Sequence, residues 1–179
     1  MDIRNVLETE HSKASTMKIV RHVGKSSKRF AEIVGFVTGD EPLLAQRASW
    51  VISHCTESAP QIVEACLPEL LKNLRDRAQV HDAVRRNTMR AASLLEIPDD
   101  IAGLAVDLAF GYLTSAEEPV AVKVYSMSII QRLSEREPVL ADELRLHLEQ
   151  QIPGSDKAAF RSRARKVLAA LDKAQRSSE

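Results

Sequence analysis

Aromatic side chains and glycine are both scarce in this chain. Only 4% of the 179 residues are Phe, Tyr or Trp, and glycine occurs 6 times. Sheet proteins draw on aromatic residues for their strands and on glycine for their tight turns, so this composition argues against a sheet. Leu, Ala, Glu, Arg and Lys are abundant instead, and these residues lose little free energy on entering a helix. We therefore expect an all-α protein.

The chain also lacks a disulfide framework and long apolar segments. Its 2 cysteines are Cys55 and Cys66, and both fall inside predicted helices. This usage fits a reducing compartment, in which we expect both to be reduced and buried as small apolar residues. No segment has the length of a signal peptide or a membrane span. The expectation is a soluble, cytoplasmic protein with one domain over residues 1–179.

What the chain does contain is a weak repeat of close to forty residues. Prolines at the start of the second helix of successive pairs lie 38 and 40 residues apart, at Pro60, Pro98 and Pro138. A basic residue in the first helix recurs at steps of 39, 37 and 40 residues, at Arg47, Arg86, Lys123 and Arg163. Such periods are typical of two-helix arrays, in which each unit buries its apolar face against its neighbours.

Apolar spacing and helix-end residues predict the individual helices. A leading helix lies within residues 1–12, and the tail, residues 175–179, is expected to fray. Capping boxes are predicted at Ser58 with Gln61 and at Ser115 with Glu118. A break is predicted at Pro153 and Gly154, followed by a last helix that Ser155 caps and that ends near Ala174. The helices between these ends are predicted at Lys13–Val23, Ser27–Val37, Pro42–Glu57, Pro60–Leu74, Val80–Leu95, Asp99–Leu113, Pro119–Leu133 and Pro138–Gln151.

Four segments resemble the first-helix motif of HEAT repeats, in which a proline or apolar start precedes a basic residue and then small residues. They are residues 46–52, 84–92, 119–127 and 160–168. The resemblance implies a right-handed HEAT-like α-α solenoid of about four helix pairs plus terminal helices. The Asp that often precedes the basic residue in HEAT units is missing, and the pair at 13–37 matches poorly, as a divergent cap would. The resemblance indicates architecture and says little about activity.

The chain also resembles small bacterial HEAT-repeat proteins of unknown function, some of which are labelled adenylosuccinate lyase. Adenylosuccinate lyases are much longer enzymes with a mobile loop containing Ser and Met-Pro, and nothing in this sequence matches that loop. Because a function has to be argued from a site, we do not expect this activity.

Other chemistry-bearing patterns are missing from the sequence as well. It contains no HExxH, paired CxxC, phosphate-binding or dinucleotide glycine motif, and no Gly-x-Ser-x-Gly turn. His54 and Cys55 are adjacent in a helix and point in different directions, so they do not converge on one ion. We predict no catalytic residues, no metal site and no cofactor, although an enzyme site assembled from distant residues stays an open alternative.

Charge is distributed unevenly although the net charge is zero. Both ends are basic, whereas residues 96–149 carry 11 acidic against 4 basic residues. A nucleic-acid-binding or base-repair protein resembling HEAT-like alkylpurine DNA glycosylases is the alternative function. Trp50 is the only Trp and is expected in the core, the predicted second helices are acidic, and a stacking surface for bases is missing. Nucleic acid is therefore not the expected partner.

The candidate site comes from the helix at 99–113. Its buried face is predicted to hold Ile101, Leu104, Ala105, Leu108 and Tyr112. Asp107 and Phe110 then lie on the opposite face, and the repeat steps align Asp107 with Glu69 and His147. These three residues, with Phe110 and Glu143, are predicted to form one ridge on the concave face. An aromatic anchor among carboxylates suits a basic protein or peptide partner.

The function predicted from the sequence is a non-enzymatic scaffold that binds such a partner on its concave face. The protein itself is expected to be a monomer or a weak homodimer.

Overall fold

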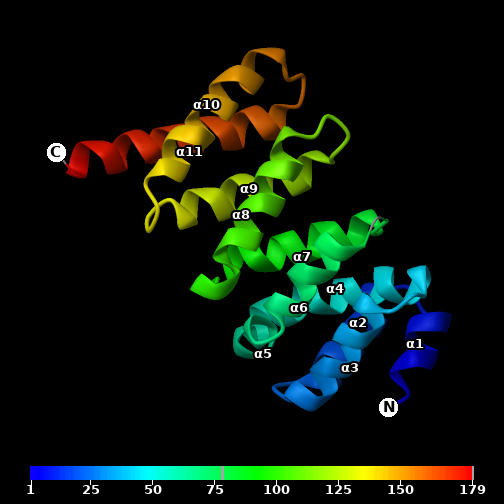
Figure 1. Cartoon of the computed structure of the whole chain (residues 1–179). Coiled ribbons are helices and arrows are strands. Elements are labelled where there is room, and N and C mark those ends of the chain that lie inside the picture. Colours follow the sequence, from blue (N-terminus) through cyan, green and yellow to red (C-terminus); the bar gives the residue numbers. More distant parts are fainter. Residues whose placement is uncertain (78, 179) are drawn as a thin grey trace. The chain divides into compact units, whose positions relative to one another are not determined.

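The computed structural model describes residues 1–77 and 79–178, which form eleven helices and no strand (Figure 1). The chain divides into two compact units, Met1–Ile101 and Ala102–Glu179. The boundary falls inside helix α8 (Asp99–Thr114). The all-α fold class is thus confirmed, whereas the single domain expected over 1–179 stays a prediction. Within the described residues, no helix has the length and apolar character needed to cross a membrane.

In the described part of the first unit, seven helices precede α8. They are α1 (Ile3–Thr9), α2 (Lys13–Val23), α3 (Ser27–Thr38), α4 (Pro42–Ser58), α5 (Pro60–Glu64), α6 (Leu67–Asp76) and α7 (Asp82–Leu94). The hydroxyls of Ser12 and Ser26 cap α2 and α3 by accepting from backbone N–H groups three residues on. Gly24 ends α2 with a φ of 55°, a left-handed conformation that glycine adopts without a steric cost.

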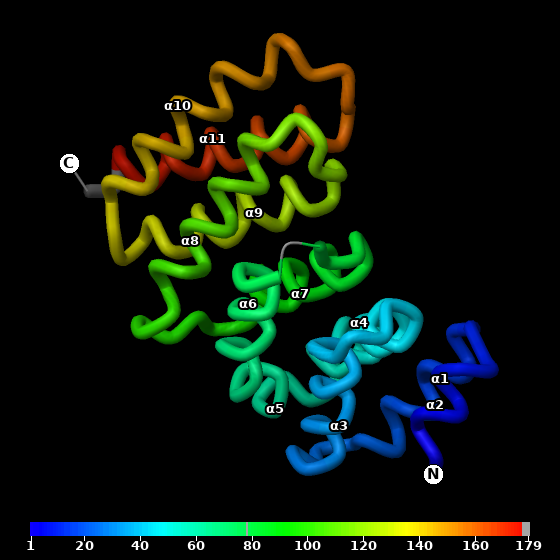
Figure 2. Tube along the Cα trace, turned by 45° about the vertical axis from the view of Figure 1, so that its right-hand side comes forward, coloured from blue at the N-terminus to red at the C-terminus, as the bar shows by residue number. Residues whose placement is uncertain are grey.

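Helix α4 lies at the centre of the first unit. It packs against α1, α2, α3, α5 and α7 (Figure 2). Its inward residues Ala48, Val51, Ile52 and Cys55 are fully buried. Burial raises the pKa of the Cys55 thiol to about 11, so this side chain is a neutral, small apolar group as expected. Cys66 is only half-buried, so the expectation of two buried cysteines is wrong for Cys66.

Side-chain hydrogen bonds join neighbouring repeats of the first unit. Arg47 Nη1 donates to the carbonyl of Leu7, 40 residues earlier, at 2.6 Å. Asn87 Nδ2 donates to the hydroxyl of Ser49, 38 residues earlier, at 2.9 Å. The separation of Asn87 and Ser49 matches the sequence period because their bond connects α7 to its equivalent α4 in the adjacent repeat, whereas Arg47 on α4 reaches the end of the leading helix α1.

The basic residue that makes this contact differs from repeat to repeat. Arg47 occupies the predicted position, but Arg86 is exposed, and Arg90 one turn later takes its place. Arg90 Nη1 donates to the carbonyl of Ser53, 37 residues earlier, at 3.0 Å. Arg90 also bonds the Glu57 carboxylate and thereby holds the pKa of Glu57 below its usual range.

The second unit holds most of α8 together with α9 (Val120–Leu133), α10 (Val139–Gly154) and α11 (Ala158–Ser178). Helices α9, α10 and α11 pack against one another (Figure 2). Arg163 Nη2 on α11 donates to the hydroxyl of Ser128 on α9, 35 residues earlier, at 2.8 Å. This bond links two first helices, as Asn87 and Ser49 do in the first unit.

One predicted helix, Pro60–Leu74, is two helices in the structure. Helix α5 ends at Glu64, and α6 begins at Leu67 with Pro68 in its first turn. Pro68 has no backbone N–H and cannot bond the carbonyl of Glu64 four residues earlier, so the helix breaks there.

Both predicted capping boxes are wrong. The Ser58 hydroxyl donates back to the carbonyl of His54 at 3.2 Å, which leaves Ala59 as the cap of α5 without a side-chain bond. The Ser115 hydroxyl accepts from the backbone N–H of Glu117 at 3.3 Å, and Pro119 precedes α9 instead. In both places the serine hydroxyl satisfies a local backbone group before the helix begins.

The C-terminal part is more helical than the sequence predicts. Helix α10 continues through Pro153 to Gly154. A proline in the last turn of a helix is tolerated because only one backbone hydrogen bond is lost there. Ser155 accepts from the N–H of Lys157 at 3.3 Å just before α11. The tail that was expected to fray continues α11 as far as Ser178, and residue 179 lies outside the described part.

Replacing Arg47 by alanine should destabilise the first unit. The variant removes the charged donor that satisfies carbonyls at the end of α1, so we expect a loss of about 1–2 kcal/mol in the free energy of unfolding. Urea unfolding measures it. Arg86→Ala is the matched control, and its exposed side chain should cost less than about 0.5 kcal/mol. Equal losses in the two variants would contradict the assigned contact.

Candidate functional site

The five predicted site residues lie on three helices. Glu69 is on α6 in the first unit, whereas the other four belong to the second unit. Asp107 and Phe110 are one turn apart on α8, and Glu143 and His147 are one turn apart on α10. The three carboxylates are exposed, and the two rings are half-buried.

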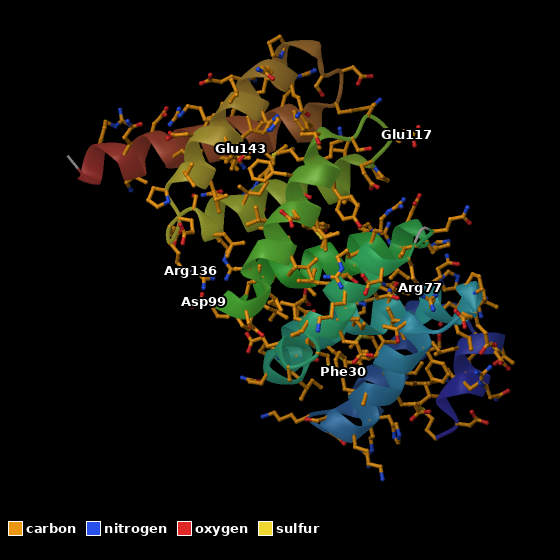
Figure 3. All side chains as sticks on the ribbon, viewed as in Figure 1. Phe30, Arg77, Asp99, Glu117, Arg136 and Glu143 are labelled. Atoms are coloured by element: carbon orange, nitrogen blue, oxygen red, sulfur yellow. The ribbon has the colours of Figure 1, made fainter. Side chains whose placement is uncertain are left out.

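The structure brings the α8 and α10 residues together through their rings. The ring centroids of Phe110 and His147 are 5.6 Å apart with a tilt of 52° between the planes. His147 Nε2 lies 3.9 Å from a carboxylate oxygen of Glu143, and this contact is an ion pair only when the imidazole is protonated. We call Asp107, Phe110, Glu143 and His147 the Phe110 surface. Glu143 is exposed and is labelled in Figure 3.

Glu69 lies in the first unit, whereas the whole Phe110 surface lies in the second unit. Its exposed carboxylate lies near Cys66 and, after burial of the thiol, is the second cause that raises the pKa of Cys66. The single ridge predicted across the repeats therefore stays a prediction for Glu69.

The buried face of α8 is narrower than the predicted one. Its fully buried side chains follow an i, i+4 spacing and are Ile101, Ala105, Ala109 and Leu113. Leu104, Leu108 and Tyr112 are only half-buried, so the prediction is wrong for these three. Ala105 and Ala109 are small and permit close packing along the buried line of α8. The spacing of apolar residues in the sequence does not distinguish this line from the neighbouring one, which holds the larger Leu104, Leu108 and Tyr112.

Helix α10 is fixed by two leucines and exposes a third. Leu144 and Leu148 are fully buried, whereas the side chain of Leu146 is 55% exposed. Because Leu146 lies between Glu143 and His147 along the helix, it adds an apolar group beside the Phe110 surface. Leu146 is not among the residues predicted from the sequence, although its place outside the Leu144 and Leu148 spacing marks it as exposed.

Trp50 was predicted to lie in the core, but it is only half-buried, so this prediction is wrong. Its ring contacts His11 edge-on at a centroid distance of 5.9 Å and His54 at 5.8 Å. His54 lies one turn from Trp50 on α4, so sequence spacing could have found this contact. His11 comes from the segment between α1 and α2, and no sequence pattern indicates its approach.

The second unit also contains a hollow of about 690 Å³ at the ends of α9, α10 and α11. Pro138, Ala141 and Leu171 contribute apolar surface to it. Arg145, also in its lining, pairs with Asp172 at 2.6 Å. Sequence analysis missed this hollow because its residues come from three separate helices.

The Phe110 surface combines an aromatic ring with exposed carboxylates, which are groups that attract cations. Aromatic faces attract guanidinium and ammonium groups, and the nearby carboxylates add charge of the opposite sign. Among the described residues, no three His, Cys, Asp or Glu side chains lie close enough together to hold a metal ion.

Comparison with known proteins identifies the family of the chain. The family model described as the HEAT repeat domain matches residues 3–171 of the chain. No curated protein matches the chain significantly, and no solved structure does.

The Phe110 and His147 rings should be energetically coupled. In a double-mutant cycle with Phe110→Leu and His147→Gln, we expect a coupling energy of about 0.5–1 kcal/mol from the loss of the ring contact. Urea unfolding of the wild type, both single variants and the double variant measures it. Purely additive losses would show that the rings do not interact in solution.

Proposed function

The chain belongs to the HEAT repeat family, and we propose that it is a non-enzymatic scaffold whose Phe110 surface binds a basic peptide or protein segment. A helical repeat offers a pre-formed surface for binding and requires no catalytic groups.

The observation that carries this proposal is the Phe110–His147 contact at 5.6 Å, with carboxylates beside it. An aromatic anchor that is partly buried and held by a second ring is typical of residues that dominate binding energy. Asp107 and Glu143 are exposed and supply negative charge around it. A lysine or arginine side chain can place its cation over the Phe110 ring and against these carboxylates.

The buried residues that anchor the two helices support the same proposal. Ala105 and Ala109 anchor α8, and Leu144 and Leu148 anchor α10, and all four are fully buried. A surface on anchored helices loses little conformational entropy when a partner binds, so more of the contact energy appears as affinity.

The alternative, nucleic-acid binding, has less support. The indole of Trp50 is occupied by contacts with His11 and His54, which leaves less of its face for stacking on a base. The carboxylates of Asp107 and Glu143 repel phosphate. Duplex DNA therefore serves as the comparison ligand in the experiment.

Selection from a random peptide display library against the full-length protein tests the proposal. We expect the selected peptides to be enriched in Lys and Arg. Their affinity, measured by fluorescence anisotropy, should fall about tenfold or more in Phe110→Ala with Asp107→Lys, because the anchor is lost and one charge is reversed.

The matched control changes the same residue types elsewhere. Phe36→Ala removes a half-buried Phe in the first unit, and Glu117→Lys reverses an exposed acid between α8 and α9 (Figure 3). This control variant should bind the peptides as the wild type does. Peptides without basic enrichment, or equal losses in both variants, would contradict the proposal. Tight DNA binding that survives physiological salt would favour the alternative.

A further inference from the structure

Helices α2 and α3 form a hairpin whose charge is mostly positive, and the one acidic residue on these two helices is Glu32 on α3. Between His11 and Ala31 the chain has six basic residues and no Asp or Glu. We call them the basic hairpin, and they are Lys13, Lys18, Arg21, Lys25, Lys28 and Arg29. All six are exposed.

Few of these charges are neutralised within the described part of the chain. Lys18 lies 3.7 Å from a carboxylate oxygen of Glu10, which is outside the hairpin. Arg29 donates to the carbonyl of His22 at 2.7 Å, a neutral acceptor. In residues 1–77 and 79–178 no carboxylate lies within ion-pair distance of Arg21, Lys25 or Lys28, so the turn around Gly24 presents three unneutralised cations.

The side chains between these cations indicate the kind of partner. The only Phe, Tyr or Trp from Lys13 to Ala31 is Phe30, which is fully buried, and the imidazole of His22 is half-buried, so the segment offers little ring surface for stacking on bases. No large apolar residue of this segment is exposed, so the hairpin lacks the apolar face with which helices enter a membrane surface. The exposed charged groups of the basic hairpin are all cations. They are complementary to a protein surface that exposes carboxylates.

The Phe110 surface is such a surface, and it belongs to the same chain. We propose that the basic hairpin of one molecule docks on the Phe110 surface of a second copy of this chain. This inference rests on the proposed function, because it names the basic segment that the Phe110 surface binds.

The contacts expected in this complex use chemistry that the molecule already contains. The Arg4 guanidinium lies over the ring of Phe36 with its central carbon 5.5 Å from the centroid. Arg21 makes the same contact on the Phe110 ring of the second copy, and Lys25 and Lys28 approach Asp107 and Glu143. The interface is polar and exposed to solvent, so the association is weak and sensitive to salt.

The geometry of the contact is head-to-tail, because two different surfaces meet. Such a contact leaves one hairpin and one Phe110 surface free in every open dimer. The molecules therefore add further copies as the concentration rises, and the average mass grows past that of a dimer.

Sedimentation equilibrium of the full-length protein tests the inference by charge reversal. One variant reverses the hairpin with Lys25→Glu and Lys28→Glu, and a second reverses the other surface with Asp107→Lys and Glu143→Lys. All four side chains are exposed, and circular dichroism checks that the helices are retained. Arg165→Glu with Lys166→Glu is the control, because it reverses two exposed cations on α11.

We expect the wild type to associate at about 0.05 M salt and to be monomeric at about 0.5 M, where charges are screened within a few ångströms. Each reversed variant should be monomeric alone, because the positions that meet in the proposed contact, 25 and 28 on one copy and 107 and 143 on the other, now carry the same sign. An equimolar mixture of the two should associate again, since each hairpin meets a surface of opposite sign. The α11 control should associate like the wild type.

Several results would overturn the inference. They are a wild type that is monomeric at every concentration, a reversed variant that still associates alone, and a mixture that stays monomeric. A mass that does not depend on concentration would show that the hairpin binds no second copy. If the wild type binds the selected basic peptides and yet stays monomeric, the self-docking is wrong and the proposed function stands. If it binds no basic peptide, the proposed function itself fails.

Discussion

Within each unit, the stacking of a first helix against its equivalent one repeat away, as α7 on α4 and α11 on α9, is the constraint on which this structure depends. In the first unit, α4 lies among α1, α2, α3, α5 and α7, so most of its surface is covered by neighbours. Polar bonds follow the same step, as Arg47 and Asn87 reach residues 40 and 38 positions earlier. A single pair of helices could not bury its apolar face alone. Each pair therefore needs a neighbouring pair to cover that face.

This constraint also explains where a binding surface can form. On less enclosed helices such as α8 and α10, packing uses one face and leaves the exposed face free to vary with little loss of stability. On α8 and α10 the buried lines of small and aliphatic residues hold the helices, and Phe110, His147, Asp107 and Glu143 project elsewhere. The half-buried Phe110 ring lies on such a face and contacts His147, and we propose that it also serves in binding.

Much of the fold could be predicted from the sequence because helix ends are local. The bounds of α2 match the prediction, and α4 and α8 begin where Pro42 and Asp99 predict. The break before α6 could also have been predicted, since Pro68 lacks the backbone N–H that the interior of a helix starting at Pro60 would need. The choice between Arg86 and Arg90 was not readable, because it depends on which turn of α7 faces α4.

The placement of the candidate residues was predictable only in part. The repeat steps brought Asp107 and His147 into one alignment, and the structure places the rings of Phe110 and His147 in contact. The tilt between these rings, the exposure of Leu146 and the approach of His11 to Trp50 come from packing between helices, which residue spacing does not describe.

Hydrogen–deuterium exchange of the full-length protein, with and without a saturating basic peptide, tests the central claim most directly. The account predicts that the peptide slows exchange in α8 and α10 around Phe110 and His147. Slower exchange elsewhere in the chain, with α8 and α10 unchanged, would contradict it.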